Sequence, residues 1–136
     1  YTTLFRSPYL SDTACIYRLV DEYKKYGSLV IAYDFDNCVF DYHSKGHDYI
    51  EVIELLKQAK EINCYMVVFT AEKDLEKVKN TLNDLKIPFD AINENPPFFK
   101  SDARKIYFNL LLDDRAGLLS AYIQLKETIN IIKNKI

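Results

Sequence analysis

Glycine and proline are scarce in this chain of 136 residues, which has three glycines and four prolines. This scarcity argues against a flexible linker or a low-complexity segment. Hydrophobic residues make up 49% of the sequence, which is enough to build a packed core. We therefore expect residues 1–136 to form a single domain.

An excess of charge of one sign is also missing. The formal net charge is −2, and the basic residues are spread along the chain. Such a surface has no electrostatic reason to bind nucleic acid irrespective of sequence, or to bind an anionic membrane. Three cysteines, Cys15, Cys38 and Cys64, are odd in number and have no metal-type spacing. This usage favours a reducing compartment over a disulfide scaffold.

Long apolar runs and a signal-peptide pattern are absent from the sequence. No run approaches the ~20 residues that cross a bilayer, so we expect a cytoplasmic protein without membrane contact. Residues 1–7 read Tyr-Thr-Thr-Leu-Phe-Arg-Ser and resemble the translation of a common sequencing adapter. We expect this segment to be non-native and exclude it from the fold prediction.

Apolar runs alternate with stretches of helical periodicity. The runs that predict buried strands cover residues 29–33, 65–69, 87–92 and 107–112. The periodic stretches predict helices over about 12–26, 49–59, 75–85 and 118–132. Strands that are apolar on both faces and alternate with helices are typical of a covered parallel sheet. We predict an α/β fold, a three-layer sandwich with a mainly parallel sheet and helices on both faces.

Polar side chains follow three of these runs. The first run ends in Asp34 and Asp36, the second in Thr70, and the last in Asp113 and Asp114. The carboxyl ends of parallel strands share one edge, where open α/β sheets bind ligands. An isolated Asp-x-Asp is as often a local turn former as a functional pair. The prediction of a site therefore depends on all three runs meeting at that edge.

Four carboxylates at one edge of a sheet would repel one another. Their pKa values would rise unless a cation lay among them. Mg²⁺ prefers carboxylate oxygens, a backbone carbonyl and waters in an octahedral arrangement. An anionic substrate, most commonly a phosphate, would complete the coordination of that ion. The sequence thus predicts a Mg²⁺ site for a phosphorylated substrate.

The order and spacing of these features over residues 29–117 resemble the haloacid dehalogenase (HAD) superfamily of aspartate-dependent phosphatases. The resemblance implies a Rossmannoid core and Mg²⁺-dependent phosphomonoester hydrolysis through an aspartyl-phosphate. It assigns Asp34 as the nucleophile and Asp36 as the general acid and then the general base. Asp34, the backbone carbonyl of Asp36, and Asp113 would hold the metal, with Asp114 acting directly or through water.

The resemblance also assigns phosphate binding to two further segments. The hydroxyl of Thr70 and the N–H of Ala71, at the start of the next helix, would bind the phosphate. Lys105 would neutralise the nucleophile and the transferring phosphoryl group, with Lys100 as the alternate. The alternative for any of Lys100, Arg104 and Lys105 is a solvated loop charge.

Cys38 departs from the family pattern, which commonly has threonine at this position. A thiol is a poorer hydrogen-bond donor than a hydroxyl, so we expect the loop after Asp36 to be held differently. We expect this departure to affect the rate of the reaction more than the class of reaction. A catalytic role for Cys38 is not expected, because no histidine stands in a recognisable partner position.

Several loop residues have weaker functional interpretations. His43 and His47 are too few for a zinc site in a segment that is not helical. Contact of Tyr42, His43 or His47 with substrate is a minor alternative. Phe98 and Phe99 either stack on a base or cover an edge of the sheet.

The segments between the motifs leave no room for a cap domain. A capless site is open, so it suits a bulky phosphorylated substrate or needs a neighbouring subunit to close it. A nucleotide, a nucleic-acid end, a phosphosugar and a phosphoprotein all remain compatible. The alternative to an enzyme is a HAD-like metal-binding regulatory or interaction module with little turnover, for which Cys38 and the uncertain lysine are the grounds.

Overall fold

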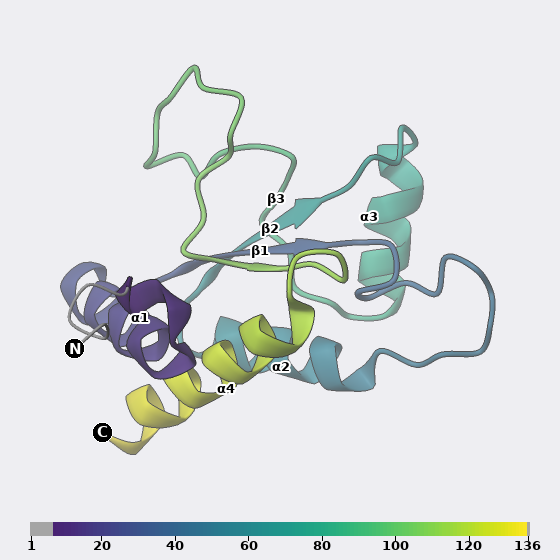
Figure 1. Ribbon diagram of the computed structural model, residues 1–136. Coiled ribbons are helices and arrows are strands. Elements are labelled where there is room, and N and C mark those ends of the chain that lie inside the picture. The colour runs from purple at the N-terminus through teal and green to yellow at the C-terminus, as the bar shows by residue number, and fades with distance from the viewer. Residues whose placement is uncertain (1–6, 136) are drawn as a thin grey trace.

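The computed structural model describes residues 7–135 (Figure 1). The adapter-like segment predicted at 1–7 lies outside these residues except for Ser7. The Ser7 hydroxyl accepts a hydrogen bond from the N–H of Tyr9 at 3.2 Å, where a short 3₁₀ turn covers Pro8–Leu10.

Four strands form one parallel sheet in the order β3-β2-β1-β4. The strands are β1 (Val30–Asp34), β2 (Tyr65–Phe69), β3 (Ala91–Ile92) and β4 (Leu110–Leu112). The helices are α1 (Asp12–Tyr26), α2 (Ile50–Glu61), α3 (Leu75–Asp84) and α4 (Leu118–Asn134). The mainly parallel α/β sandwich predicted from the sequence is confirmed.

Local signals in the sequence define the ends of α1. The hydroxyl of Ser11 accepts a hydrogen bond from the N–H of Ala14 at 3.3 Å and caps the first turn. Gly27 ends the helix with a φ of 75°, and its N–H donates to the carbonyl of Tyr23 at 2.7 Å. Among residues 7–135, no helix has the length and apolar character of a membrane-crossing segment.

The main core lies on one face of the sheet, where all four helices contribute to it. In Figure 1, α1, α2 and α4 lie together on this side. The sheet supplies Ile31, Tyr33, Met66, Val68, Leu110 and Leu112, and the helices supply Leu19, Leu55, Leu56, Val78, Leu82, Leu125 and Ile129. This helical layer holds the strands in register and so positions their carboxyl ends.

The second face of the sheet differs from the prediction of helices on both faces. Val30, Ala32 and Val67 are buried there under Ile106, Tyr107 and Phe108, among other side chains. The segment 93–109 that carries these aromatic residues contains no helix and runs over the sheet as the green loop in Figure 1. Its sequence begins Asn-Glu-Asn-Pro-Pro, and proline interrupts helical hydrogen bonding, so a loop takes the place of the expected layer.

Two strands are shorter than the apolar runs that predicted them. The last strand begins at Leu110 instead of 107, because the N–H of Tyr107 donates to the side chain of Asn95 at 2.7 Å and not to the sheet. The run 87–92 contributes only Ala91 and Ile92 to β3. Pro88 in this run has no N–H to donate to a ladder.

Candidate active site

The register of the sheet brings the polar strand ends together. Tyr33 in β1 pairs with Leu112 in β4, and Asp34 pairs with Phe69 in β2. Because the strands are parallel, Asp113 follows on one side of Asp34 and the residue after Phe69 follows on the other. The carboxyl edge of the sheet therefore carries acidic and hydroxyl side chains from three segments.

Three carboxylates form the centre of this edge. Asp34, Asp113 and Asp114 each offer an oxygen within 4.8 Å of the others. In the part of the chain that the structure describes, no other group of three His, Cys, Asp or Glu side chains is close enough to hold a metal. An all-carboxylate set suits a hard cation such as Mg²⁺ better than a metal that prefers nitrogen or sulfur.

The negative charges around Asp34 favour a cation at this edge of the sheet. Burial is the largest cause that raises the pKa of Asp34 from 3.8 to about 7, and a hydrogen bond with Asp114 and the negative charges of Asp113 and Asp114 contribute to the same rise. The backbone of Phe35 opposes the shift and lowers the pKa of Asp34. A divalent cation among these oxygens would relieve the repulsion, so the donor set fits the Mg²⁺ that the sequence predicts.

The chain coils immediately after β1. The N–H groups of Val39 and Phe40 both donate to the carbonyl of Phe35 at 3.1 Å, and the N–H of Asn37 donates to the carbonyl of Phe40 at 2.8 Å. Asn37 has a φ of 58°, a left-handed conformation that asparagine tolerates better than most residues. This tight turn lets Asp34 and Asp36 both stay near the carboxyl edge.

The carboxylate of Asp36 stands apart from the group of three. Burial is the main cause of its raised pKa, and the negative charge of Glu72 adds to it while Lys77 opposes it. A carboxyl group whose pKa is raised holds its proton closer to neutral pH, as a general acid requires. Glu72 and Lys77 are influences on Asp36 that sequence reasoning missed, because they come from another segment.

Cys38 ties this turn to the neighbouring strand. Its side chain is fully buried, and its Sγ donates to the carbonyl of Leu112 at 3.5 Å. Burial raises the pKa of Cys38 to about 12, so the group is a neutral thiol at physiological pH. A buried neutral thiol is a weak donor and a poor nucleophile, so this geometry gives Cys38 a structural role.

A hollow of about 430 Å³ adjoins Asp34 at the carboxyl edge. Its other lining residues are Phe69, Thr70, Ala71, Asn93, Arg104, Lys105, Ile106 and Phe108. The structure thus brings Thr70, Ala71 and Lys105 to the same space as Asp34. Arg104 also lines this hollow, whereas Lys100 does not.

Asn93 holds the turn that carries Thr70, and the sequence did not indicate it. Its side-chain oxygen accepts from the N–H of Thr70 at 3.0 Å, and its side-chain nitrogen donates to the carbonyl of Thr70 at 2.8 Å. The N–H of Asn93 donates in turn to the carbonyl of Val68 at 2.9 Å. These three bonds fix Thr70 beside the end of β2.

The hydroxyl of Thr70 can still donate to a ligand. Its oxygen accepts from the N–H of Glu72 at 3.0 Å, which leaves the hydroxyl proton free. Helix α3 begins at Leu75 with Asp74 as its cap, so Ala71 lies in the preceding turn. The expectation that Ala71 opens the helix is therefore wrong, and the helix dipole does not act directly at its N–H.

His43 lies close enough to Asp36 for its positive charge to lower the pKa of that carboxyl, whereas the two loop phenylalanines lie away from the carboxylates. His43 and His47 are exposed in a loop without helix, and within residues 7–135 neither belongs to the acidic group. Phe98 packs edge-on against Tyr65 and Phe99 stacks on Tyr107, near the amino-terminal edge of the sheet. Contact of Phe98 or Phe99 with a ligand at Asp34 is therefore not supported.

The connections that would carry a cap domain are short. A loop of residues 35–49 joins β1 to α2, and α3, β3 and the loop 93–109 lie between β2 and β4. Over residues 7–135 neither connection contains an inserted domain, so the hollow beside Asp34 opens to solvent.

A solved structure described as a conserved protein coded by a locus from Bacteroides thetaiotaomicron is similar to this chain, with a TM-score of 0.59 and 21% sequence identity. The alignment covers 80% of this chain and 93% of that chain. At this identity the similarity is one of fold alone. No protein-family description and no curated protein matches the sequence. A functional conclusion must therefore come from the chemistry of the site.

Proposed function

We propose that this protein is a Mg²⁺-dependent phosphomonoester hydrolase of the HAD type. The observation that carries the proposal is the approach of Asp34, Asp113 and Asp114 to within 4.8 Å at the carboxyl edge of a parallel sheet. The hollow beside Asp34 also holds Thr70 and Lys105, which are donors suited to a phosphate.

The chain offers several oxygen ligands for the metal, and water and substrate would complete its coordination. Asp34 and Asp113 would hold Mg²⁺ directly, with the backbone carbonyl of Asp36, and Asp114 would act directly or through water. When bound, the ion would offset the charges of the carboxylates and of the substrate phosphate.

Asp34 and Asp36 have different roles in the proposed reaction. Asp34 attacks the phosphorus in line, which forms an aspartyl-phosphate and breaks the bond to the leaving oxygen. Asp36 gives its proton to that oxygen and then accepts a proton from water. The water attacks the aspartyl-phosphate, which releases inorganic phosphate and restores Asp34.

Phosphate binding depends on the loops that follow β2 and precede β4. The hydroxyl of Thr70 and the N–H of Ala71 donate to the phosphate oxygens, and Lys105 offsets their charge. The open hollow favours a bulky phosphorylated substrate, or closure by a second subunit.

Hydrolysis of p-nitrophenyl phosphate and of a panel of phosphate esters tests the proposal. We expect turnover that needs Mg²⁺ and is lost in Asp34→Asn, while Asp102→Asn, an exposed loop change, keeps full activity. The alternative is a metal-binding regulatory or interaction module with little turnover, which the exposure of Lys105 favours. Mg²⁺ binding without any Asp34-dependent turnover on the panel would refute the hydrolase and support that module.

A further inference from the structure

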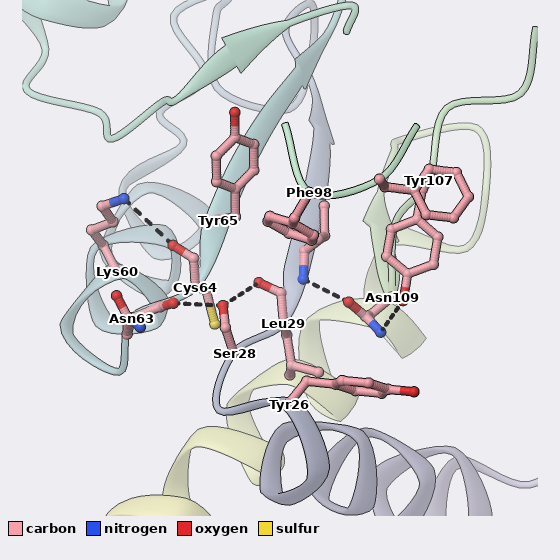
Figure 2. A pocket seen from close by; sticks show the side chains of 12 residues that line it. Tyr26, Ser28, Leu29, Lys60, Asn63, Cys64, Tyr65, Phe98, Tyr107 and Asn109 are labelled. Atoms are coloured by element: carbon pink, nitrogen blue, oxygen red, sulfur yellow. Dashed lines mark hydrogen bonds between the residues drawn. The ribbon is translucent and has the colours of Figure 1, made fainter. Parts of the chain in front are cut away.

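A second and larger hollow lies at the amino-terminal edge of the sheet (Figure 2). Its volume is about 720 Å³, and Tyr26, Leu29, Tyr65, Phe98, Tyr107 and Asn109 are among its lining residues. Val30, which also lines it, precedes Asp34 by four strand residues, or about 13 Å. The hollow is therefore separate from the candidate active site.

Two aromatic rings project at opposite ends of this hollow. Figure 2 shows Tyr26, from the end of α1, on one side of Leu29 and Phe98, from the loop 93–109, on the other. Tyr26 is 68% exposed and Phe98 is 67% exposed. The Phe98 ring is also oriented by an edge-on contact with Tyr65, at a centroid distance of 5.8 Å. Such rings offer faces on which a planar ligand can stack.

One wall of the hollow is pre-formed by hydrogen bonds. Asn109 is buried, and its side-chain oxygen accepts from the N–H of Val30 at 2.6 Å. Its side-chain nitrogen donates to the hydroxyl of Tyr107 at 3.1 Å, and the Tyr107 ring stacks on Phe99 at 4.6 Å. Because the Tyr107 oxygen accepts this bond, its proton is available to a ligand.

The lining is electrically neutral. Lys60 is the one charged residue among the described residues that line the hollow, and its Nζ lies 2.8 Å from Oδ2 of Asp90. This pairing leaves little attraction for an anion. The side-chain amide of Asn63, on the wall near Lys60, offers a donor and an acceptor to a neutral ligand.

We propose that this hollow binds a neutral, planar heteroaromatic molecule of about nucleoside size. The ring stacks on Phe98 or Tyr26, and its edge forms hydrogen bonds with Tyr107 and Asn63. The volume lies within the usual range for small-molecule sites. Since the hollow is far from Asp34, the proposal does not depend on the hydrolase activity.

Titration with adenosine, followed by calorimetry and by ligand-observed NMR, tests this site. We expect saturable binding with one molecule per chain, and much weaker binding of ribose, which lacks the ring. Either Tyr26→Ala or Phe98→Ala should weaken binding about tenfold, because one of these two rings provides the stacking face. Tyr17→Ala is the matched control, since Tyr17 is 62% exposed on the same helix but outside the hollow. Asp34→Asn should bind adenosine as the wild type does.

Three results would overturn the proposal. The first is no saturable adenosine binding up to the solubility of the probe. The second is binding that neither Tyr26→Ala nor Phe98→Ala weakens. The third is a dimer in sedimentation equilibrium that Phe98→Ala dissociates, because a second copy of the chain would then occupy the hollow.

Discussion

Replacement of Asp34 by asparagine should stabilise the metal-free protein at pH 8, although it removes the proposed nucleophile. Burial and the neighbouring carboxylates raise the pKa of Asp34 from 3.8 to about 7. The folded state therefore binds this proton more tightly than the unfolded state does. This tighter proton binding contributes to the free energy of unfolding. The contribution is fully present below about pH 4 and is lost as the pH rises through about 7. At pH 8 Asp34 is ionised in the folded wild type, where burial and the neighbouring carboxylates disfavour its negative charge.

The size of the effect follows from the pKa shift. A shift of about three units corresponds to about 4 kcal/mol at 1.36 kcal/mol per unit. Asp34 is partly exposed, so solvent screening reduces the expected gain of Asp34→Asn to about 2 kcal/mol. For a domain of this size that gain raises the Tm by roughly 6 °C.

Urea unfolding followed by circular dichroism measures this difference, since the chain has no tryptophan to report by fluorescence. The experiment compares wild type, Asp34→Asn and the exposed control Asp102→Asn at pH 5 and pH 8, with a chelator present. Asp34→Asn should gain stability over wild type mainly at pH 8, and Mg²⁺ should narrow the gap by binding the folded wild type. A variant that is no more stable than wild type at pH 8, or that gains equally at both pH values, would refute the reasoning.

Four further substitutions probe the same edge of the sheet. Asp113→Asn should weaken Mg²⁺ binding at least about tenfold, because it removes a ligand charge; the Mg²⁺-induced rise in Tm measures it, and an unchanged rise would exclude Asp113 as a ligand. Asn93→Ala removes two hydrogen bonds to Thr70, so the free energy of unfolding should fall by about 1–2 kcal/mol. Because Thr70 is then held less firmly, kcat/KM should fall about tenfold. A fall in stability alone would mean that Asn93 does not position the phosphate site. Lys105→Ala should lower kcat/KM about 100-fold and Lys100→Ala less than about twofold; the reverse order would make Lys100 the neutralising lysine.

Local patterns in the sequence determined the positions of the four strands, though not the length of two of them, and also most helix ends and the acidic edge. Ser11 and Gly27 define α1 because capping depends on residues a few positions apart. The parallel sheet was predictable because its strands are apolar on both faces. Once the strands are parallel, Asp34 and Asp113 must lie at the same edge of the sheet, and the structure pairs β1 with β4 and places their carboxylates together. Their catalytic and metal-binding roles stay predictions.

Only the tertiary structure decided which hydrogen bonds support the carboxyl edge of the sheet and which side chains line the hollow at the amino-terminal edge. Asn93 binds Thr70 across 23 residues of chain, Cys38 binds the carbonyl of Leu112 across 74, and Asn109 binds Val30 across 79. No periodicity or local propensity encodes such pairs, because they form only when the packed sheet brings distant segments into contact. The loop over the second face and the aromatic hollow beneath it arise in the same way. The side-chain contacts in these two regions depend on how residues 93–109 pack against the strands.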